Sequence, residues 1–470
     1  MTARRRRGVI AGSRVGAMYE VPVAQLDRNE VKKHLAALTM QPKDTFQKGD
    51  GSFPAYEVRT KDGRPETLAV PRFYGLEHFG RPEHEDTTEG APICDEHAHF
   101  AGALQPHQVE ATGAVWEAWQ RGMPVSGGIV VLGCGQGKTV CALNLISRLK
   151  RRTLVLCHKA FLLDQWCARA KTFLPNATLG LIRQKTATVD ADIVMASLQS
   201  VAMRDYPSGT FDGFGLMIID EAHHIAAPVL SKGLAKLPTR YMLSLSATPE
   251  RRDALPLHHS VGPILFRAAR PKNERVLITR MVYKSQWQTE IVGRDGKPQF
   301  ARMLNRLAED AQRTAWAAVH VSKLLRKRRQ VIVLSDRIQQ LETLCSAVLA
   351  LGHAKENAAF YIGRCSDAER REAEEKQLLL STYAMAREGL DIGRLDTLCL
   401  LSPSSSVEQA VGRILRPCSE KQTPLVLDLV DGYSVFQHMA AKRLRFYQKS
   451  QYEIQDVTAD WDVNDARLYS

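Results

Sequence analysis

The chain has 470 residues, with 44% hydrophobic and 24% charged content, which is typical of a globular protein with two or three domains. It contains no apolar run long enough to cross a bilayer, so we expect no membrane partner. The nine Cys residues are scattered, and Cys157 and Cys399 lie inside apolar segments. This pattern argues against a disulfide framework and favours a soluble intracellular protein, without deciding between nucleus, cytoplasm and virion.

The formal net charge of +13 is carried by the part of the chain that follows the first 98 residues. Residues 1–98 hold 15 Lys and Arg against 15 Asp and Glu, so the whole excess falls in residues 99–470. A basic surface there favours a polyanionic partner such as nucleic acid, although a generic basic protein is an equal alternative. The four arginines at 4–7 fit a transit peptide, a nuclear-targeting patch or a solvated arm.

The first part of the chain divides into an accessory region and an α/β region. Residues 1–98 are mixed in composition, and we assign no fold to them beyond a small α+β domain as one option. In residues 99–270, short β-branched apolar runs alternate with helical stretches, which predicts the buried parallel strands of an α/β sheet. These runs are residues 129–132, 153–157, 192–196, 216–219 and 241–245.

A second α/β region follows. Residues 271–300 contain Pro271, Gly293 and Gly296, so we expect a linker or a small hairpin. The alternation then resumes in residues 301–435, which predicts a second parallel sheet of similar size. Its apolar runs are residues 331–334, 359–362, 378–381, 397–401 and 425–429. Residues 436–470 form a basic C-terminal tail that includes an amphipathic stretch.

A glycine-rich loop follows the first predicted strand. Residues 133–139 read Gly-Cys-Gly-Gln-Gly-Lys-Thr, and residues 140–149 are predicted to form a helix, which is the context of a phosphate-binding loop. Gly135 and Gly137 would let backbone N–H groups turn toward the phosphates of ATP. Lys138 would neutralise the β- and γ-phosphates, and the Thr139 hydroxyl would bind Mg²⁺. Leu132 departs from the longer phosphate-loop pattern, which has Gly there.

Two carboxylates end another predicted strand. Asp220 and Glu221 follow residues 216–219, so we expect them at the carboxyl edge of the sheet, where α/β folds bind ligands. Asp220 would hold Mg²⁺ through water, and Glu221 would activate the attacking water. The alternative is an acidic helix N-terminus with no catalytic role.

Two further motifs gain meaning from their order in the chain. Ser246 and Thr248 close a third strand and precede Pro249, where small hydroxyl groups can contact the acidic pair, although a turn is the default interpretation. Arg413 and Arg416 are three residues apart on an expected helix, so they would share one face and suit a γ-phosphate. Two solvated surface arginines are the alternative.

The ordered set of motifs resembles a superfamily 2 helicase of the DExH type over about residues 100–430. It comprises Leu-Gln-Pro-His-Gln at 104–108, Gly-Gln-Gly-Lys-Thr at 135–139, Asp-Glu-Ala-His at 220–223, Ser-Ala-Thr at 246–248, Arg-Glu-Gly-Leu-Asp at 387–391 and Gln409 with Gly-Arg-x-x-Arg at 412–416. The resemblance implies two tandem RecA-like domains that bind ATP between them.

The resemblance also implies residue roles. Gln108 would read adenine, and Gly133 and Gln136 would complete the loop around the nucleotide. Gly389 and Asp391 would face the nucleotide from the second domain. Arg416 would act as the arginine finger, and Gln409 and Arg413 would approach the γ-phosphate.

Three segments are similar to the XPB-like branch of this superfamily. They are residues 154–166, which end in Asp-Gln-Trp166, the stretch Ala-Thr-Pro-Glu-Arg-Arg-Asp at 247–253, and Lys-Arg-Leu-Arg-Phe-Tyr at 442–447. Val-Pro-Arg-Phe-Tyr-Gly at 70–75 looks most like the large DNA-virus members.

The resemblance also suggests a nucleic-acid track gripped mainly through phosphates, which suits movement independent of sequence. The candidate contacts are His158, Lys159, Ser197, Gln199, Ser335, Arg337 and Thr382. Each of these positions has an ordinary turn or strand-end role as an even alternative. The basic cluster at 148–152 lies at a helix end, where it would complement the helix dipole. Cys94, His97 and His99 resemble only a fragment of a metal site.

These patterns predict an ATP-dependent and Mg²⁺-dependent helicase or translocase that acts on nucleic acid, with DNA expected ahead of RNA. The resemblance to superfamily 2 helicases further suggests 3′→5′ movement. Transcription, repair or recombination machinery is the expected partner class. One alternative is a translocase that remodels nucleic-acid–protein complexes without separating strands. Another is a non-catalytic binding module, which the presence of Lys138, Glu221 and Arg416 opposes.

Overall fold

The computed structural model describes residues 8–40, 52–133, 135–184, 186–221, 227–247, 257–268, 275–283, 290–294, 296–388, 390, 392–416, 418 and 421–458. The chain separates into two compact units, Met1–Ala269 and Arg270–Ser470. Each unit is described by itself below. No helix in the described ranges is long and apolar enough to cross a membrane.

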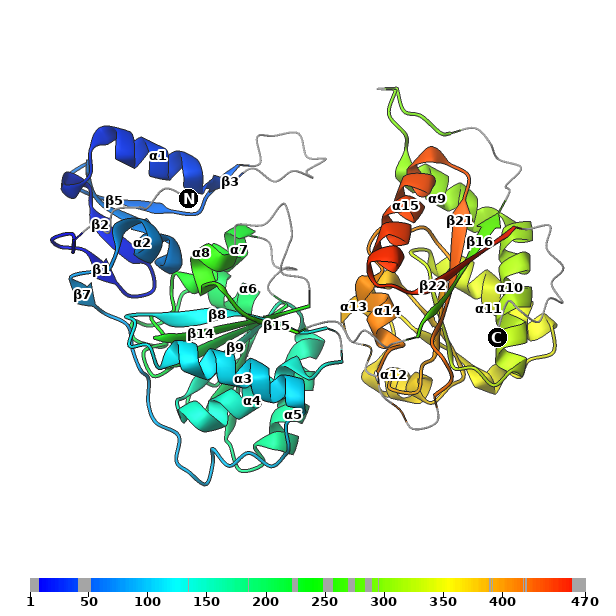
Figure 1. The fold of residues 1–470 in the computed structure, drawn as a ribbon, viewed down its shortest axis with the longest axis horizontal. Helices are drawn as coiled ribbons and strands as arrows, with labels where there is room; N and C mark the ends of the chain where they lie inside the picture. Colours follow the sequence, from blue (N-terminus) through cyan, green and yellow to red (C-terminus); the bar gives the residue numbers. More distant parts are fainter. Residues whose placement is uncertain are drawn as a thin grey trace. The chain divides into compact units, whose positions relative to one another are not determined.

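The first unit begins with a small five-stranded sheet in the order β5-β6-β2-β1-β7 (Figure 1). Its strands are β1 Arg14–Val15, β2 Tyr19–Pro22, β5 Glu57–Lys61, β6 Arg64–Val70 and β7 His84–Glu85, and the short pair β3 Thr39–Met40 and β4 Phe53–Pro54 lies beside it. Helix α1 Arg28–Leu38 starts at Asp27, whose carboxylate accepts hydrogen bonds from the Asn29 and Glu30 N–H groups. Helix α2 Arg72–Phe79 follows β6. The described part of residues 1–98, for which the sequence offered a small α+β domain as one option, thus builds a small α+β module.

The larger sheet of this unit has eight strands in the order β11-β10-β12-β9-β13-β14-β8-β15. Its strands are β8 Ser126–Val131, β9 Thr153–Cys157, β10 Leu179–Arg183, β11 Thr186–Ala187, β12 Ile193–Ser197, β13 Leu216–Asp220, β14 Tyr241–Ser246 and β15 Ile264–Arg267. All neighbours are parallel except β10 and β11. Consistent with burial on both faces, β9 and β13 are buried along their whole length.

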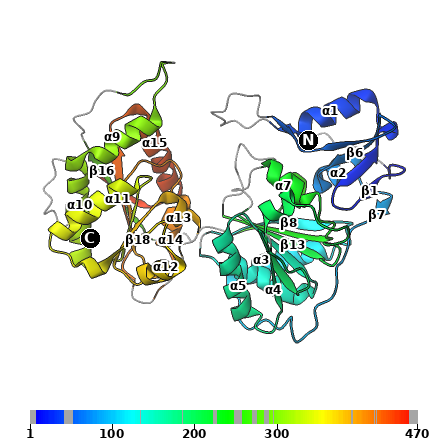
Figure 2. The same ribbon diagram turned by 180° about the vertical axis from the view of Figure 1, so that it is seen from behind.

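Helices cover both faces of this sheet (Figures 1 and 2). They are α3 Pro106–Trp119, α4 Lys138–Leu149, α5 Ala160–Phe173, α6 Leu198–Met203, α7 Ala227–Leu234 and α8 Leu257–Val261. Helices α3, α4 and α5 share one apolar cluster with the sheet. The other face forms a cluster with α6, α7 and the N-terminal module, which includes Tyr19 and Leu68. The N-terminal module is therefore continuous with the core of the α/β domain.

The second unit contains a seven-stranded sheet in the order β18-β19-β17-β20-β21-β16-β22. Its strands are β16 Leu277–Tyr283, β17 Val331–Leu334, β18 Ala358–Tyr361, β19 Leu378–Ser381, β20 Thr397–Leu400, β21 Leu425–Asp431 and β22 Glu453–Thr458, all parallel to their neighbours. Strand β16 lies inside the segment expected to be a linker, and β22 lies inside the expected tail. Both segments therefore contribute to the second sheet.

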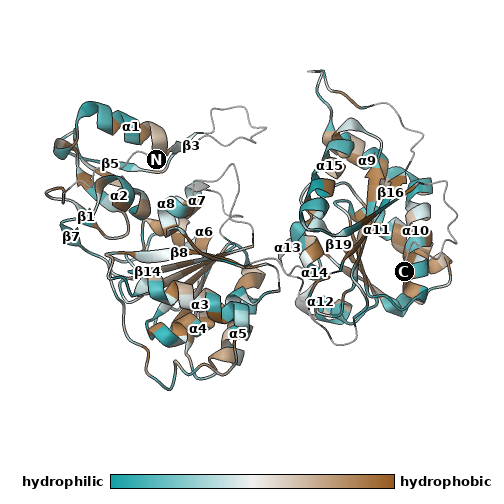
Figure 3. Cartoon of the chain, viewed as in Figure 1, coloured by the Kyte–Doolittle hydropathy of each residue, from teal (hydrophilic) through white to brown (hydrophobic). Residues whose placement is uncertain are grey.

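The helices of the second unit are α9 Phe300–Glu309, α10 Ala311–Arg326, α11 Ile338–Ala350, α12 Asp367–Glu374, α13 Tyr383–Glu388, α14 Glu408–Arg413 and α15 Ser434–Lys449. Helices α10 and α11 pack on one face of the sheet, and α13 and α14 pack on the other. Hydrophobic residues concentrate along the strands of both units, while the helices carry both hydrophilic and hydrophobic residues (Figure 3).

Candidate active site

Three neighbouring strands of the first unit end at the same edge. The parallel register pairs Val131 with Ser246 and Asp220 with Leu245, so β8, β14 and β13 terminate side by side. The Leu132 N–H also donates to the Ser246 carbonyl at 3.2 Å. The glycine-rich loop leaves β8 at this edge, and the acidic pair ends β13 there. The fold therefore brings the two sequence motifs together.

The loop is shaped by glycines and held by glutamines. Gly135 and Gly137 have positive φ angles of 80° and 78°, and Gly137 is the N-cap of α4. The Gly133 N–H donates to Gln136 Oε1 at 2.6 Å. Lys138 and Thr139 begin α4 directly after the loop, so the helix N-terminus faces the loop. Cys134 lies outside the described residues.

Gln108 is buried and fastens the loop to α3. Its Nε2 donates to the Gln136 carbonyl at 3.1 Å, and its Oε1 accepts from the Gln105 N–H at 2.9 Å. His107 Nε2 lies 3.0 Å from the same Gln136 carbonyl. The side chain predicted to read adenine is thus directly bonded to the phosphate-loop segment, and its role toward adenine stays a prediction.

Lys138 and the acidic pair are in direct contact. Lys138 Nζ lies 3.3 Å from Glu221 Oε1, and both side chains are mostly buried, at 11% and 18% exposure. Lys138 Nζ also donates to the Leu132 carbonyl at 3.4 Å. Asp220 is buried beside them, and its Oδ2 accepts a hydrogen bond from the Trp166 indole N–H at 2.8 Å.

The environment of Asp220 opposes its ionisation. Burial and the neighbouring Glu221 raise the pKa of Asp220 to about 6, against the lowering effects of Lys138 and of the Trp166 hydrogen bond. Glu221 itself has a left-handed backbone with φ of +50°, which is strained for a residue with a Cβ atom. Such outliers cluster at functional sites.

The donor set at this edge fits a magnesium ion. Mg²⁺ prefers oxygen ligands and binds through few protein groups together with water and phosphate oxygens. The Thr139 hydroxyl and the Asp220 carboxylate are oxygen donors of this kind, and they belong to α4 and to the end of β13 at this edge. The residues present therefore suit Mg²⁺ bound together with a nucleoside triphosphate.

The second unit holds the other predicted catalytic residues on or near α14. Gln409 is buried in this helix. The Arg413 guanidinium donates to the Ala386 and Leu390 carbonyls at 2.9 and 2.8 Å, so it supports the segment around α13. Helix α14 ends at Arg413, and the expectation that Arg413 and Arg416 share one helix face was wrong. Arg416 precedes Pro417, and a residue before proline is disfavoured in the helical conformation.

Three predicted residues, Gly389, Asp391 and Thr248, lie outside the described residues. Ser246 is fully buried at the end of β14.

The candidate nucleic-acid contacts lie directly at strand ends. His158 and Lys159 follow β9, and Ser197 ends the neighbouring strand β12, where the register pairs it with Cys157. Gln199 is exposed in the first turn of α6. These residues therefore share one edge of the first sheet with the glycine-rich loop.

The corresponding positions of the second sheet follow β17 and β19. Thr382 follows β19, and Arg337 is the N-cap of α11. Ser335 is fully buried, its hydroxyl donates to Gln340 Oε1 at 2.7 Å, and it accepts from the Arg337 N–H. Ser335 thus shapes the loop that presents Arg337, and direct contact of its hydroxyl with nucleic acid stays a prediction.

Two other sequence features have structural partners. In the basic cluster at 148–152, Arg151 lies 3.3 Å from Glu89 and Lys150 lies 2.7 Å from Asp95, so these two carboxylates neutralise part of it. His97 Nδ1 lies 2.9 Å from Asp192 Oδ2. Among the described residues, no group of three or more His, Cys, Asp or Glu side chains is arranged to hold a metal ion.

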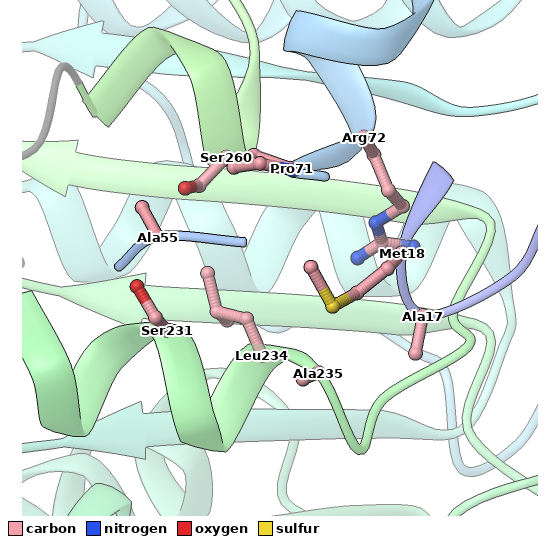
Figure 4. Close-up of a pocket in the computed structure, with 9 residues that line it drawn as sticks. All are labelled: Ala17, Met18, Ala55, Pro71, Arg72, Ser231, Leu234, Ala235 and Ser260. Atoms are coloured by element: carbon pink, nitrogen blue, oxygen red, sulfur yellow. The ribbon is translucent and has the colours of Figure 1, made fainter. Parts of the chain in front are cut away.

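A small cavity lies away from the glycine-rich loop, between the N-terminal module and helices α7 and α8 (Figure 4). Its volume of about 30 Å³ suits one or two water molecules and excludes a nucleotide. Arg72 lines it and is buried, and its Nη1 donates to the Thr239 carbonyl at 2.6 Å. Burial lowers the pKa of Arg72 to about 9. This contact attaches α2 to the α/β domain.

Trp166 was not among the site residues predicted from the sequence. It is 54 residues from Asp220, so no spacing rule connects the two. The only signal was its place in the segment that resembles the XPB-like branch.

The chain is similar in sequence to viral helicases over most of its length. Residues 102–251 match the family model described as type III restriction enzyme, res subunit. A protein of Acanthamoeba polyphaga mimivirus, named for an ATP-dependent RNA helicase activity, is 30% identical over 452 residues, which covers 93% of this chain and 85% of that protein. A protein of Invertebrate iridescent virus 6 named as a helicase is 26% identical, with 68% and 76% coverage.

Solved structures share the fold at low sequence identity. The ATP-dependent type ISP restriction-modification enzyme LlaBIII bound to DNA is 15% identical with a TM-score of 0.55, and the match covers 77% of this chain and 32% of that one. Dbp5 of S. cerevisiae, bound to RNA and ADP BeF3, is 15% identical with a TM-score of 0.50, and the match covers 79% and 96%. These likenesses support the two RecA-like sheets.

Proposed function

We propose that this chain, which belongs to the superfamily 2 helicases and is therefore an ATP-dependent enzyme, is a motor. In this proposal it couples ATP hydrolysis to 3′→5′ movement along DNA. The observation that carries the proposal is the meeting of Lys138, Asp220 and Glu221 at the sheet edge beside the glycine-rich loop. Transcription, repair or recombination is the proposed setting.

The residues of this edge have complementary proposed roles. Lys138 exchanges its contact with Glu221 for the β- and γ-phosphates, and the loop N–H groups hold the phosphate oxygens. Glu221 then orients the attacking water and accepts its proton. Mg²⁺, held by Thr139 and Asp220, would neutralise charge on the phosphates when bound. Gln108, joined to the loop through Gln136, is proposed to sense adenine.

Arg416 is proposed as the arginine finger that completes hydrolysis. Arg416→Ala is expected to retain ATP binding and lose roughly 10³–10⁵ in turnover, since an arginine finger contributes about that factor. Binding is measured by fluorescence anisotropy with a labelled non-hydrolysable ATP analogue, and turnover by phosphate release. Normal turnover in this variant would show that Arg416 is not the finger.

One comparison of ATPase rates tests whether the substrate is DNA or RNA. The mimivirus relative is named as an RNA helicase, one structural neighbour was solved bound to DNA, and another was solved bound to RNA. Both kinds of nucleic acid are therefore tested. Rates are measured with single-stranded DNA, duplex DNA, branched DNA and RNA, with Lys138→Ala as the blank. We expect the largest stimulation by single-stranded DNA. Stimulation by RNA alone would reassign the substrate, and stimulation by no polymer would reject the motor.

The second candidate function is a translocase that removes bound proteins without separating strands. We keep this candidate because the family model that matches residues 102–251 is described as a restriction-enzyme subunit and not as a helicase. Strand displacement on duplexes with a 3′ or a 5′ tail is compared with displacement of a protein bound to the same DNA. Displacement of the protein alone would select the translocase.

A further inference from the structure

The indole of Trp166 is hydrogen-bonded to the Asp220 carboxylate. Its Nε1–H donates to Oδ2 at 2.8 Å, and both residues are buried, at 1% and 7% exposure. The bond joins α5 to the end of β13, where the candidate metal ligand sits. In a buried site such a bond is strong and directional, because little water competes for either group.

Packing alone does not explain this contact. Trp119 is also buried, at 3% exposure, and its indole N–H has no hydrogen-bond partner among the described residues. The core of this unit therefore tolerates an indole whose N–H is unsatisfied. The orientation of Trp166 toward Asp220 is a specific feature, and Trp119 provides a matched control within the same apolar cluster.

The hydrogen bond acts on the group that would bind the cation. By holding Oδ2, the indole fixes the rotation of the Asp220 carboxylate about its Cβ–Cγ bond. A carboxylate that binds a metal must be charged and correctly turned, and groups that hydrogen-bond to ligands commonly set both properties. Loss of such a group typically weakens metal binding by about 10–100-fold.

Helix α5 also connects Asp220 to the candidate nucleic-acid edge. His158 and Lys159 stand at its N-terminus, and Trp166 lies seven residues after Lys159. Lys159 is the N-cap of α5, and Trp166 lies about two helical turns, or roughly 10 Å, further along the same helix. A displacement of the first turn would therefore move the indole along with it.

We propose that Trp166 is a positioning residue, which holds the Asp220 carboxylate in its metal-binding orientation and transmits nucleic-acid binding at the start of α5 to the ATP site. The proposal rests on the proposed function, because it takes Asp220 as a metal ligand.

The first test measures metal-dependent nucleotide binding rather than turnover. Full-length wild type, Trp166→Phe and Trp119→Phe are titrated with Mg²⁺ in the presence of a labelled non-hydrolysable ATP analogue, and anisotropy reports binding. We expect the half-saturating Mg²⁺ concentration to rise about 10–100-fold in Trp166→Phe only. Binding in EDTA should be the same in all three proteins. Equal Mg²⁺ midpoints in the two variants would overturn the positioning role.

The second test measures only the proposed transmission from nucleic-acid binding at the start of α5 to the ATP site. At saturating Mg²⁺, the ratio of nucleic-acid-stimulated to basal ATPase rate is compared across the same proteins. We expect the ratio to fall about 5-fold or more in Trp166→Phe, the range of a typical coupling between sites, and to stay near wild type in Trp119→Phe. A wild-type ratio in Trp166→Phe would remove the transmission role.

Two further variants keep the outcomes distinct. Asp220→Asn must itself shift the Mg²⁺ midpoint; if it does not, the metal assignment in the proposed function fails. If Asp220→Asn shifts the midpoint and Trp166→Phe does not, only the present inference fails. Thermal unfolding checks that each variant folds. If the smaller ring of Phe destabilises the core, benzothienylalanine incorporated at position 166 takes its place, because it keeps a double ring of the same size and has no N–H donor.

Discussion

Gly137 packs closely against Gln108 in the glycine-rich loop. Its φ is +78°, and a Cβ atom there would lie 2.1 Å from Gln108 Nε2. Gly122 has a similar φ of +66°, but a Cβ atom there would meet no heavy atom within 4 Å. Alanine at Gly122 is therefore a control that introduces backbone strain without a steric clash. In either place alanine strains the backbone by about 1–2 kcal/mol.

Gly137→Ala is therefore expected to weaken ATP binding about 10-fold or more, which corresponds to about 1.4 kcal/mol, because it also displaces Gln108 from the loop. Gly122→Ala should lower thermal stability and leave ATP affinity near wild type. The measurements are nucleotide anisotropy and thermal unfolding. Equal ATP affinity in the two variants would show that the Gln108 contact has no role in binding.

His320 gives the second unit a predictable response to acid. It is 3% exposed in α10, and burial, helped by nearby Lys323, lowers its pKa to about 4. The unfolded chain has a His pKa of about 6.5, so between these values the unfolded state binds a proton that the folded state does not. This stability is present above about pH 6.5 and is lost as the pH falls toward 4, by on the order of 3 kcal/mol.

His320→Phe should reduce the loss of stability at low pH, because Phe has no group that binds a proton. Phe also keeps the aromatic contact with Trp316. Calorimetric unfolding midpoints are compared between pH 7.5 and 5 in wild type, His320→Phe and His438→Gln. His438 is exposed on α15, so its variant should follow wild type. An unchanged pH profile in His320→Phe would assign the acid sensitivity elsewhere.

At the scale of elements, a buried ion pair joins α10 to the end of β21. Arg313 Nε and Nη2 donate to Asp431 Oδ1 and Oδ2 at 2.6 and 2.8 Å, and the side chains are 1% and 3% exposed. Removing one partner leaves a buried charge without its counter-ion, so Asp431→Asn should destabilise the second unit by about 3–5 kcal/mol. Chemical denaturation measures the change.

Two variants test the physical reason for that effect. The double variant Arg313→Met with Asp431→Leu removes both charges and should recover most of the stability. The exposed pair Arg364–Glu342 has a similar distance of 2.8 Å, and Glu342→Gln should change stability by less than about 1 kcal/mol. If the exposed variant matched Asp431→Asn, burial would not be the cause.

The elements themselves show which signals in the sequence are local. The runs at 153–157, 331–334 and 378–381 coincide with β9, β17 and β19, because continuous apolar runs in parallel sheets are buried on both faces. Strand β16 was assigned to a linker because it lies between Pro271 and Gly293. Its partners β21 and β22 follow it by well over a hundred residues, and no local pattern reports such a pairing.

In the candidate site, too, some residues could be predicted from local sequence patterns and others could not. Lys138, Asp220 and Glu221 could be placed from sequence because strand ends in parallel sheets share an edge. Trp166 could not, since its role depends on a hydrogen bond between distant elements. The burial of Ser335 and the backbone contacts of Arg413 were also beyond reach, because both depend on tertiary packing rather than on spacing.

At the scale of the whole molecule, the N-terminal module is fixed to the first RecA-like domain by polar as well as apolar contacts. Arg72 reaches the Thr239 carbonyl, and Glu89 pairs with Arg151 and Arg240. The acidic residues of this module thus oppose part of the basic charge that the rest of the chain carries. The remaining positive charge is available to a polyanion.

Because of this positive charge, the salt dependence of nucleic-acid binding is the property that tests the predicted phosphate contacts. Each phosphate contact releases counter-ions, so log affinity should fall linearly with log salt concentration. Lys159 in the first unit and Arg337 in the second are the predicted phosphate contacts, and replacing either by alanine should reduce the slope by about 1. Lys61→Ala is the control, because Lys61 is 71% exposed in the N-terminal module.

The double variant of Lys159 and Arg337 distinguishes one continuous track from two separate surfaces. If a single strand is gripped by both units, the double variant should reduce the slope by about 2 on a long oligonucleotide. On an oligonucleotide too short to reach both units, only one of the two substitutions should change the slope. Equal slopes for wild type and the double variant at every length would place the nucleic acid elsewhere, and the strand ends after β9 and β17 would then have only their structural roles.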